Sequence, residues 1–279
     1  MAEIHWFPGH MKKAINNVED KIKLVDVVVE LLDARAPMSS VNEHLAKLVQ
    51  NKKRVIVLSK IDLADKEQTT KWIEYFKKDN DVVIGLDLSL PSSGKAIQNA
   101  VVKVGKSIWE KQKSKGMKPQ PIKTMIIGIP NVGKSSLINR FAKRSAAGVE
   151  NKPGFTRGQQ WIKVSNEFVL LDTPGILPMN YEDKNKAMNL ALLGSIREDI
   201  LPNEDMCRAL LKFLKVKYPN CLNARFDIPE INEFDEVIKG ICERRKLLSN
   251  GTYDIERAYK LLLTEFKNGL LGNITLEWK

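Results

Sequence analysis

Short apolar runs alternate with helical patterns along the first two-thirds of the chain. The runs are rich in Val, Ile and Leu and have the length of buried strands, while the segments between them repeat apolar residues at helical spacing. Near-continuous apolar strands that alternate with helices are typical of a mostly parallel sheet covered on both faces. We expect strands at 26–33, 54–60, 81–88, 122–129 and 167–174, and helices at 41–50, 65–78, 92–114 and 134–143.

The pattern changes near residue 180. Beyond it, apolar residues recur at helical spacing, and the segments are separated by prolines and a glycine. The sequence therefore predicts an α/β domain over residues 1–180, followed by a small all-α domain over residues 181–279. Its helices are expected at 183–200, 204–217, 232–248 and 254–268.

Charge follows the same division. The chain has 279 residues and a net charge of +11. Residues 1–180 carry 29 Lys+Arg against 18 Asp+Glu, whereas residues 181–279 carry 16 of each. An excess of this kind favours a polyanionic partner; a solvated, lysine-rich surface is the alternative.

Composition excludes several classes of protein. No apolar run approaches the roughly 18 residues that cross a bilayer, and the first residues lack the basic-then-apolar order of a secretory signal. The three cysteines have spacings that fit neither a disulfide framework nor a zinc cluster. We expect a cytoplasmic protein, with no membrane or DNA partner, that is monomeric in solution.

The strongest motif is GIPNVGKS at 128–135, which matches G-x-x-x-x-G-K-[ST] between an apolar strand and an amphipathic helix. Its glycines allow backbone N–H groups to wrap a phosphate. Lys134 should reach the β- and γ-phosphates, and the Ser135 hydroxyl should ligate Mg²⁺. A glycine-rich turn with a chance lysine is the alternative. The expected phosphate-binding residues here are Asn131, Val132, Gly133, Lys134, Ser135 and Ser136.

Two further elements that suit a bound nucleotide and its metal follow the phosphate loop. DTPG at 172–175 ends an apolar run, where Asp172 suits support of Mg²⁺ through water and Gly175 suits the γ-phosphate. Between them and the phosphate loop, NKPGFTRGQQ at 151–160 presents Thr156, whose hydroxyl can close over Mg²⁺ when the γ-phosphate is present.

The stretch VIVLSKID at 55–62 reads as a buried strand that ends in Lys-x-Asp, the pattern with which GTP-binding proteins recognise guanine. Asp62 can accept two donors from guanine, whereas adenine places an acceptor there, so discrimination of about 10⁴ is available. This motif normally follows the phosphate loop, but here it precedes it. The simplest account is a circular permutation of a Ras-like sheet, because the termini of compact domains often lie close together.

Taken together, these motifs resemble the circularly permuted GTPases of ribosome assembly, most closely the ribosome biogenesis GTPase A type. The resemblance implies a circularly permuted Ras-like P-loop GTPase domain with an N-terminal WFPGHM segment, followed by a helical RNA-binding domain. It implies GTP hydrolysis during late assembly of the large ribosomal subunit, stimulated by that subunit and accompanied by rRNA binding. The matching stretches are 6–11, 27–37, 59–62, 128–139, 151–161 and 170–177.

The resemblance also assigns the guanine contacts. It implies a first loop of Ser59, Lys60, Ile61 and Asp62 and a second loop of Asp87 and Leu88, although the second can also be read as a simple strand end. The family usually has Asn where this chain has Ser59. The absence of one hydrogen bond, about 0.5–1.5 kcal/mol, would weaken guanine affinity by up to about tenfold.

Two more site residues are implied by the same resemblance. Asn131 is similar to the phosphate-loop asparagine that holds K⁺ in potassium-activated GTPases, so potassium dependence is a hypothesis. Many Ras-like proteins have a water-orienting glutamine where this chain has Ile176, which cannot hold a water. The resemblance indicates His10 of WFPGHM as the catalytic residue; the alternative makes it a tail residue beside Trp6 and Phe7.

RNA contacts are expected on two basic faces of the helical domain. One is a stripe at helical spacing and the other is the ERRK stretch; faces balanced by acidic neighbours are the alternative. The residues are Arg208, Lys212, Lys215, Arg244 and Arg245. Two other functions remain open: a nucleotide-dependent RNA-binding module with incidental hydrolysis, and a GTPase that acts on a non-ribosomal partner.

Overall fold

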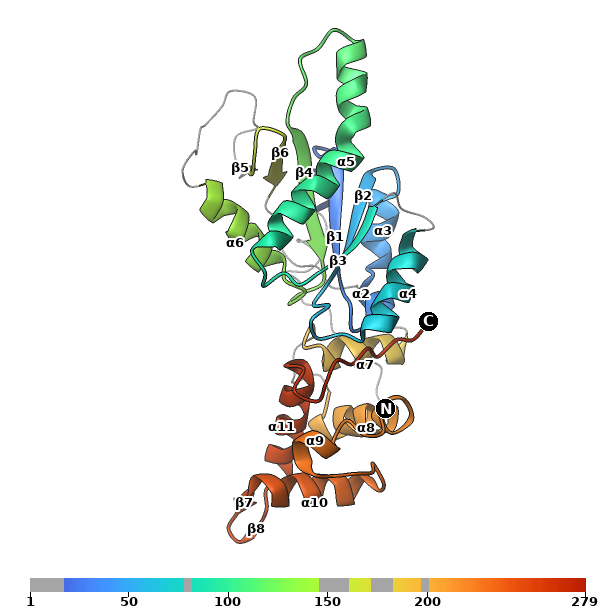
Figure 1. Ribbon diagram of the computed structural model, residues 1–279, viewed down its shortest axis with the longest axis vertical. Coiled ribbons are helices and arrows are strands. Elements are labelled where there is room, and N and C mark those ends of the chain that lie inside the picture. The colour runs from blue at the N-terminus through green and yellow to red at the C-terminus, as the bar shows by residue number, and fades with distance from the viewer. Residues whose placement is uncertain (1–17, 78–81, 146–160, 172–182, 197–200) are drawn as a thin grey trace.

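A computed structural model describes residues 18–77, 82–145, 161–171, 183–196 and 201–279. In Figure 1 the α/β region lies at one end of an elongated molecule and the helices after residue 183 lie at the other. The last residues of the chain run back from the helical region to α4 (Lys66–Lys77). The two regions therefore meet along more than one segment.

The α/β region is built on a six-stranded sheet with the order β3-β2-β1-β4-β6-β5. All neighbouring strands are parallel except β5, which pairs antiparallel with β6 at one edge. The apolar runs of the sequence form five of these strands, as predicted. The bounds are β1 Val27–Asp33, β2 Lys53–Ser59, β3 Val82–Leu86, β4 Ile122–Gly128, β5 Trp161–Lys163 and β6 Phe168–Leu171.

Both faces of the sheet are covered. One face packs against α5 and α6 in a single apolar cluster that includes Val29, Ile97 and Phe141. The other face packs against α3 and α4, with Leu45 and Trp72 among its buried side chains. The bounds of the covering helices are α3 Glu43–Val49, α5 Ser92–Ser114 and α6 Lys134–Ser145, and a short helix, α2, follows β1 at Pro37–Ser40.

The strand order identifies the permutation. If the chain is read from β4, the strand before the phosphate loop, the strands follow as β4, β5, β6, β1, β2, β3, and their places in the sheet are those of a Ras-like GTPase. The strand that leads into SKID is β2, which pairs with β1 in the sheet. In the sequence it precedes the phosphate loop. The predicted fold class is confirmed.

The helical region has its own apolar cluster, with Leu210, Phe226 and Leu262 buried in it. Ala187 and Leu190 of α7 pack on the sheet side, while Leu192 packs with the helices, so α7 bridges the two regions. The elements are α7 Lys184–Leu192, α8 Asn203–Lys217, α9 Asn223–Phe226, α10 Phe234–Arg245, β7 Leu248–Ser249, β8 Thr252–Tyr253 and α11 Ile255–Lys267.

The first helix of this region is shorter than the sequence predicts. The sequence pattern predicts a helix over 183–200, but α7 ends at Leu192 because the chain turns at Gly194, whose φ of 71° is left-handed. The proposed boundary at residue 180 stays a prediction, since residues 172–182 lie outside the described part. Among the described residues, no helix is both long and apolar enough to cross a membrane.

Candidate functional site

Four loops leave the sheet at the carboxyl ends of β1, β2, β3 and β4. The register places Asp33 beside Ser59 and Ser59 beside Leu86, with Leu31 opposite Gly128. Parallel strands bring the predicted phosphate and guanine loops to one edge of the sheet, which is where open α/β sheets bind ligands. The fold therefore places most of the described site residues in one neighbourhood.

The phosphate loop has the backbone that its glycines allow. Gly128 has a φ of 154° and Gly133 a φ of 108°. A Cβ on Gly128 would lie 2.6 Å from the carbonyl oxygen of Leu31, and one on Gly133 would lie 2.8 Å from Cδ1 of Leu88. Side chains at these two positions would push the loop away from β1 and from the second guanine loop.

Lys134 begins α6 and is only 5% exposed. Its Nζ donates to the carbonyl oxygen of Ile129 at 2.6 Å, and no carboxylate of the described residues forms an ion pair with it. Burial lowers the pKa of the ammonium to about 8. A buried cation without a counter-ion, at a helix N-terminus, fits an anionic ligand such as a phosphate.

The serines after Lys134 are suited to the metal that accompanies a nucleoside triphosphate. Ser135 and Ser136 lie in the first turn of α6 and both are exposed. Mg²⁺ prefers oxygen ligands and keeps several waters, so a single hydroxyl here fits it. The other predicted ligands, Thr156 and Asp172, lie outside the described residues, as do Gly175 and His10.

Ser59 braces the phosphate loop from within the core. It is 0% exposed, and its hydroxyl lies within hydrogen-bond distance of the carbonyl oxygens of Leu32 (3.1 Å) and Val132 (2.9 Å). The hydroxyl thereby links the end of β2 to the loop around the phosphates. Direct contact between Ser59 and guanine stays a prediction, and bracing is the role that this geometry supports.

Lys60 is held by a buried ion-pair cluster. With a φ of 57°, it places its Nζ 3.1 Å from Oδ2 of Asp33. The same carboxylate accepts from Nε and Nη2 of Arg35 at 3.0 and 2.8 Å. Burial by itself would raise the pKa of Asp33, but the charges of Arg35 and Lys60 hold that pKa below its usual range.

The remaining guanine-loop residues differ in exposure. Asp62 is exposed and has no ion pair or hydrogen bond to the described residues, so its carboxylate can accept donors from a base; Ile61 beside it is half-buried. In the second loop, Asp87 accepts from the backbone N–H of Ser89 at 2.7 Å. Leu88 is buried against the phosphate loop at Gly133.

The helical region touches the guanine side of this site. Nη1 of Arg35 donates to the carbonyl of Lys267 at the end of α11, and the N–H of Ile274 donates to the carbonyl of Leu63. Asp65 receives the Tyr218 hydroxyl at 3.2 Å, and its own N–H donates to Oγ1 of Thr275. Sequence reasoning does not find these contacts, although DARAP at 33–37 belongs to a stretch that carries the family resemblance.

The phosphate side also meets the helical region. Nδ2 of Asn131, whose φ is 60°, donates to the carbonyl of Gly194 at 2.6 Å. The hydroxyl of Ser195 donates to the carbonyl of Pro130 at 3.1 Å. Both bonds join the phosphate loop to the turn that ends α7. A role of Asn131 toward K⁺ stays a prediction.

Most of the predicted RNA-binding residues have partners within the chain. The Arg208 guanidinium stacks over the Phe234 ring at 3.8 Å, with Nη2 2.7 Å from Glu204. Arg244 pairs with Asp227 at 3.3 Å. Arg245 pairs with Glu265, and Lys215 donates to the carbonyl of Asn232. Lys212 is exposed and has no partner among the described residues.

The site now defines a class of protein: a P-loop GTPase whose sheet is circularly permuted. A family model described as "50S ribosome-binding GTPase" matches residues 123–239, which begin at β4 and leave SKID upstream. Curated relatives named "Ribosome biogenesis GTPase A" are 41% identical in Bacillus cereus (98% of this chain, 93% of the relative) and 32% identical in Thermotoga maritima (98% and 93%).

The chain belongs to the ribosome biogenesis GTPase A family. Its structure is also similar to the crystal structure of GNP-bound YlqF from T. maritima, with a TM-score of 0.67, 28% identity, and coverage of 95% of this chain and 98% of that one. A GDP-bound YlqF structure matches with the same TM-score and 29% identity. The protein is a GTPase of ribosome biogenesis that binds GTP and GDP.

Proposed function

We propose that this GTPase hydrolyses GTP on a late precursor of the large ribosomal subunit in the cytoplasm and is stimulated by that particle. The observation that supports the nucleotide half is Lys134 at the start of α6, which is buried and has no ion pair with a described carboxylate. The names of the relatives support the ribosomal half. We further propose that residues 1–180 form the GTPase domain and residues 181–279 an rRNA-binding domain.

Each described loop has a part in the proposed reaction. Lys134 and the backbone of residues 131–136 would hold the phosphates, while Asp62 would select guanine and Lys60 would support the base from its place beside Asp33. Ser135, with Thr156 and Asp172, would hold Mg²⁺, which when bound neutralises charge on the β- and γ-phosphates. Selection of guanine is tested by comparing GTP and ATP dissociation constants, which should differ by about 10⁴.

His10 is the proposed catalytic residue, since Ile176 cannot orient water. A neutral imidazole, with an unperturbed pKa of about 6.5, can accept a proton from the attacking water at cytoplasmic pH. The replacement His10→Ala should keep GTP binding and lower particle-stimulated turnover by about 10²-fold or more. Stimulated hydrolysis equal to that of the parent would assign the residue to the tail.

One experiment tests the proposal as a whole. Purified large-subunit precursors are sedimented with the protein in GTP, in GDP and in a non-hydrolysable analogue. We expect binding in the triphosphate states and release after hydrolysis. Binding in every state would indicate an RNA-binding module with incidental hydrolysis, and absence from the particle would indicate a non-ribosomal partner.

Two finer parts of the proposal have their own tests. The replacement of Arg208 and Lys212 by Glu should weaken particle binding without changing GTP affinity, if the helical face contacts rRNA. Equal turnover in matched Na⁺ and K⁺ buffers would remove the potassium role of Asn131.

A further inference from the structure

The long helix α5 carries a basic arm that projects away from the sheet. Figure 1 shows its C-terminal half extending beyond the strands before the chain returns to β4. Residues 103–120, which we call the basic arm, contain six lysines against one acidic residue, Glu110. All six lysines are exposed, and none has an ion pair with the described residues: Lys103, Lys106, Lys111, Lys113, Lys115 and Lys118.

Three of these lysines follow one face of the helix. Lys103, Lys106 and Lys113 are spaced i, i+3 and i+10, so their side chains leave neighbouring positions of the same face. At 1.5 Å per residue this stripe is about 15 Å long. A row of unpaired ammonium groups of that length matches several successive phosphates of a nucleic acid strand.

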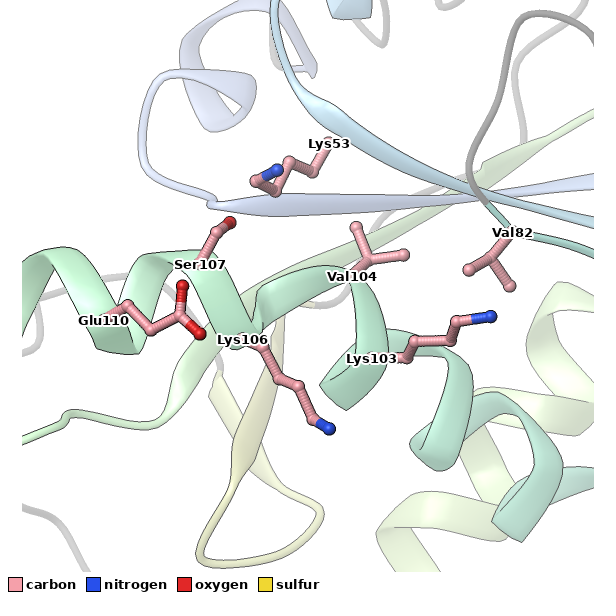
Figure 2. A pocket seen from close by; sticks show the side chains of 7 residues that line it. All are labelled: Lys53, Val82, Lys103, Val104, Lys106, Ser107 and Glu110. Carbon is pink, nitrogen blue, oxygen red and sulfur yellow. The ribbon is translucent and has the colours of Figure 1, made fainter.

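The arm begins at a pocket of about 350 Å³ between α5 and the amino ends of β2 and β3. Figure 2 shows Lys53 of β2 across from Ser107, with Lys103 and Lys106 extending from successive turns of α5. Glu110 also lines the pocket. The nucleotide loops lie at the opposite, carboxyl ends of the strands, so an anion here would not compete with GTP.

The far part of the arm is held in place. The Trp109 indole donates to the carbonyl of Gln120 at 2.9 Å, and the N–H of Gln120 donates to Oε1 of Gln112 at 2.9 Å. The N–H of Met117 donates to the Gln112 carbonyl at 3.0 Å. The segment that carries Lys115 and Lys118 therefore folds back on α5, which lowers the entropic cost of binding a partner.

We propose that the basic arm and its pocket contact the phosphate backbone of rRNA in the large-subunit precursor. This inference rests on the proposed ribosomal function. It adds a second RNA-contacting surface, on the α/β region, to the one proposed for the helical domain. It accounts for part of the excess positive charge before residue 180, whereas Arg208 and Arg244 of the helical domain have acidic partners within the chain. A membrane surface fits less well, because membrane-bound helices present an apolar face and Met117 is the one large apolar side chain exposed on the arm.

The test is a triple charge reversal on the exposed stripe. Lys103→Glu, Lys106→Glu and Lys113→Glu are combined, and particle binding is measured by sedimentation in the non-hydrolysable GTP analogue over a range of salt. We expect affinity to fall by at least about tenfold. The slope of log K against log salt should decrease by roughly one unit for each phosphate that a lysine no longer neutralises. GTP affinity and basal hydrolysis should not change.

A matched control makes the same change of charge elsewhere. Lys47→Glu, Lys66→Glu and Lys77→Glu reverse three exposed lysines on α3 and α4. The proposal is overturned if the arm variant binds the particle as well as this control does. If the unaltered protein fails to bind the particle at all, the proposed function fails instead.

Two further variants separate an effect of charge from an effect on folding, and a vesicle assay separates RNA binding from lipid binding. A triple Lys→Gln variant of the stripe keeps helix-forming residues and should bind the particle more weakly than the parent. Glu110→Gln should tighten particle binding by about twofold to fivefold, the range of one exposed charge pair. If the charge reversal abolishes binding to phosphatidylserine vesicles and leaves particle binding unchanged, the arm is a membrane contact and the proposal is overturned.

Discussion

Arg35 and Lys134 are two buried cations at the same edge of the sheet, and their charges are balanced in different ways. Arg35, 2% exposed, makes two bonds to the Asp33 carboxylate and a third to the carbonyl of Lys267. Lys134 has a carbonyl of its own loop and no carboxylate among the described residues. A buried charge costs free energy unless it is paired, so Arg35 serves the fold, whereas Lys134 fits the proposed role of a phosphate ligand.

The contacts between the nucleotide loops and the helical region also differ between the guanine side and the phosphate side. On the guanine side the hydrogen bonds are half-buried and include a buried arginine, a tyrosine and several backbone groups. On the phosphate side, the hydrogen bonds among the described residues are two, both to the turn after α7, and one of them is exposed. The polar contacts therefore anchor the guanine side more firmly, whereas the phosphate side is held chiefly by apolar packing of Leu190 and Ile196.

The largest effect is expected at the anchor. Arg35→Met should lower the free energy of unfolding by about 3–5 kcal/mol, because it leaves the Asp33 carboxylate buried with only Lys60 nearby. Urea denaturation with the ligand-free protein measures it. The double replacement Arg35→Met with Asp33→Asn should recover at least about 1 kcal/mol, since the buried carboxylate is then neutral and the remaining charge, on Lys60, is on a side chain that is 25% exposed to solvent.

The difference in the free energy of unfolding between the parent and Arg35→Met should depend on pH. The pKa of Asp33 is lowered in the folded protein, so its ion pair contributes stability above the ordinary Asp value of 3.8. This contribution disappears as the pH falls through the lowered folded value. The gap between the parent and Arg35→Met should narrow there; a gap that stays constant would mean that Arg35 acts by packing alone.

A change in stability of the opposite sign is expected when Lys134 is replaced. Lys134→Met should abolish most phosphate affinity and yet raise the free energy of unfolding of the ligand-free protein by about 1–3 kcal/mol at pH 7, since burial of the charge costs about 1.4 kcal/mol per pKa unit. Thermal unfolding with and without GTP measures both effects. A ligand-free variant less stable than the parent would show that the lysine supports the loop instead.

This effect should also depend on pH. Lys134 has a pKa of about 8 in the folded protein against 10.5 ordinarily. Below pH 8 both the folded and unfolded states carry the charge, and the cost of its burial is fully present. Between 8 and 10.5 the unfolded state binds more protons, so the stability of the parent rises with pH. The advantage of Lys134→Met should shrink over this range.

A smaller decrease in stability is expected at Tyr218. Its hydroxyl accepts from the N–H of Thr275 at 3.1 Å and lies 3.2 Å from Asp65. Tyr218→Phe leaves that N–H without an acceptor, so the free energy of unfolding should fall by about 1–2 kcal/mol. Tyr253→Phe is the control, because that tyrosine is exposed and its bond to Glu243 can be replaced by water.

The smallest effect is expected at the phosphate-side contacts. Asn131→Gly keeps the positive φ of the loop, and Ser195→Ala removes the second bond. Together they should cost about 1 kcal/mol or less in urea denaturation, because water can replace the exposed partner. A decrease larger than that of Tyr218→Phe would reverse this ranking of the polar contacts on the two sides.

Local patterns carry most of the fold and the phosphate loop. The β2 and β4 strands each contain an apolar run that leads into a recognisable turn, so their type and order can be read directly. β5 escapes sequence reasoning because three residues are too few to show a period. The cluster of Asp33, Arg35 and Lys60 escapes it because the role of DARAP depends on contacts with residues far along the chain.

The predicted RNA-binding face shows a second limit of sequence reasoning. The spacing of Arg208, Lys212 and Lys215 is that of one helical face, but spacing does not reveal partners on neighbouring elements. Phe234 and Asp235 of α10, which meet Arg208, come from another helix. Charge available to a ligand depends on such pairs, and it has to be counted in three dimensions.

The return of residues 274–279 onto the segment that follows SKID, and onto α4, has a consequence for how the chain acquires its structure. Asp65 bonds to Thr275 across 210 positions, and the Trp72 indole donates to the Glu277 carbonyl across 205. Contacts between such distant positions close late, because the entropy of a large loop must be given up before they form. The guanine loop leaves the translating ribosome early, and we expect it to stay immature until the last turns of the helical region have been made. We therefore expect the order of synthesis to delay a working nucleotide site until the helical region is folded.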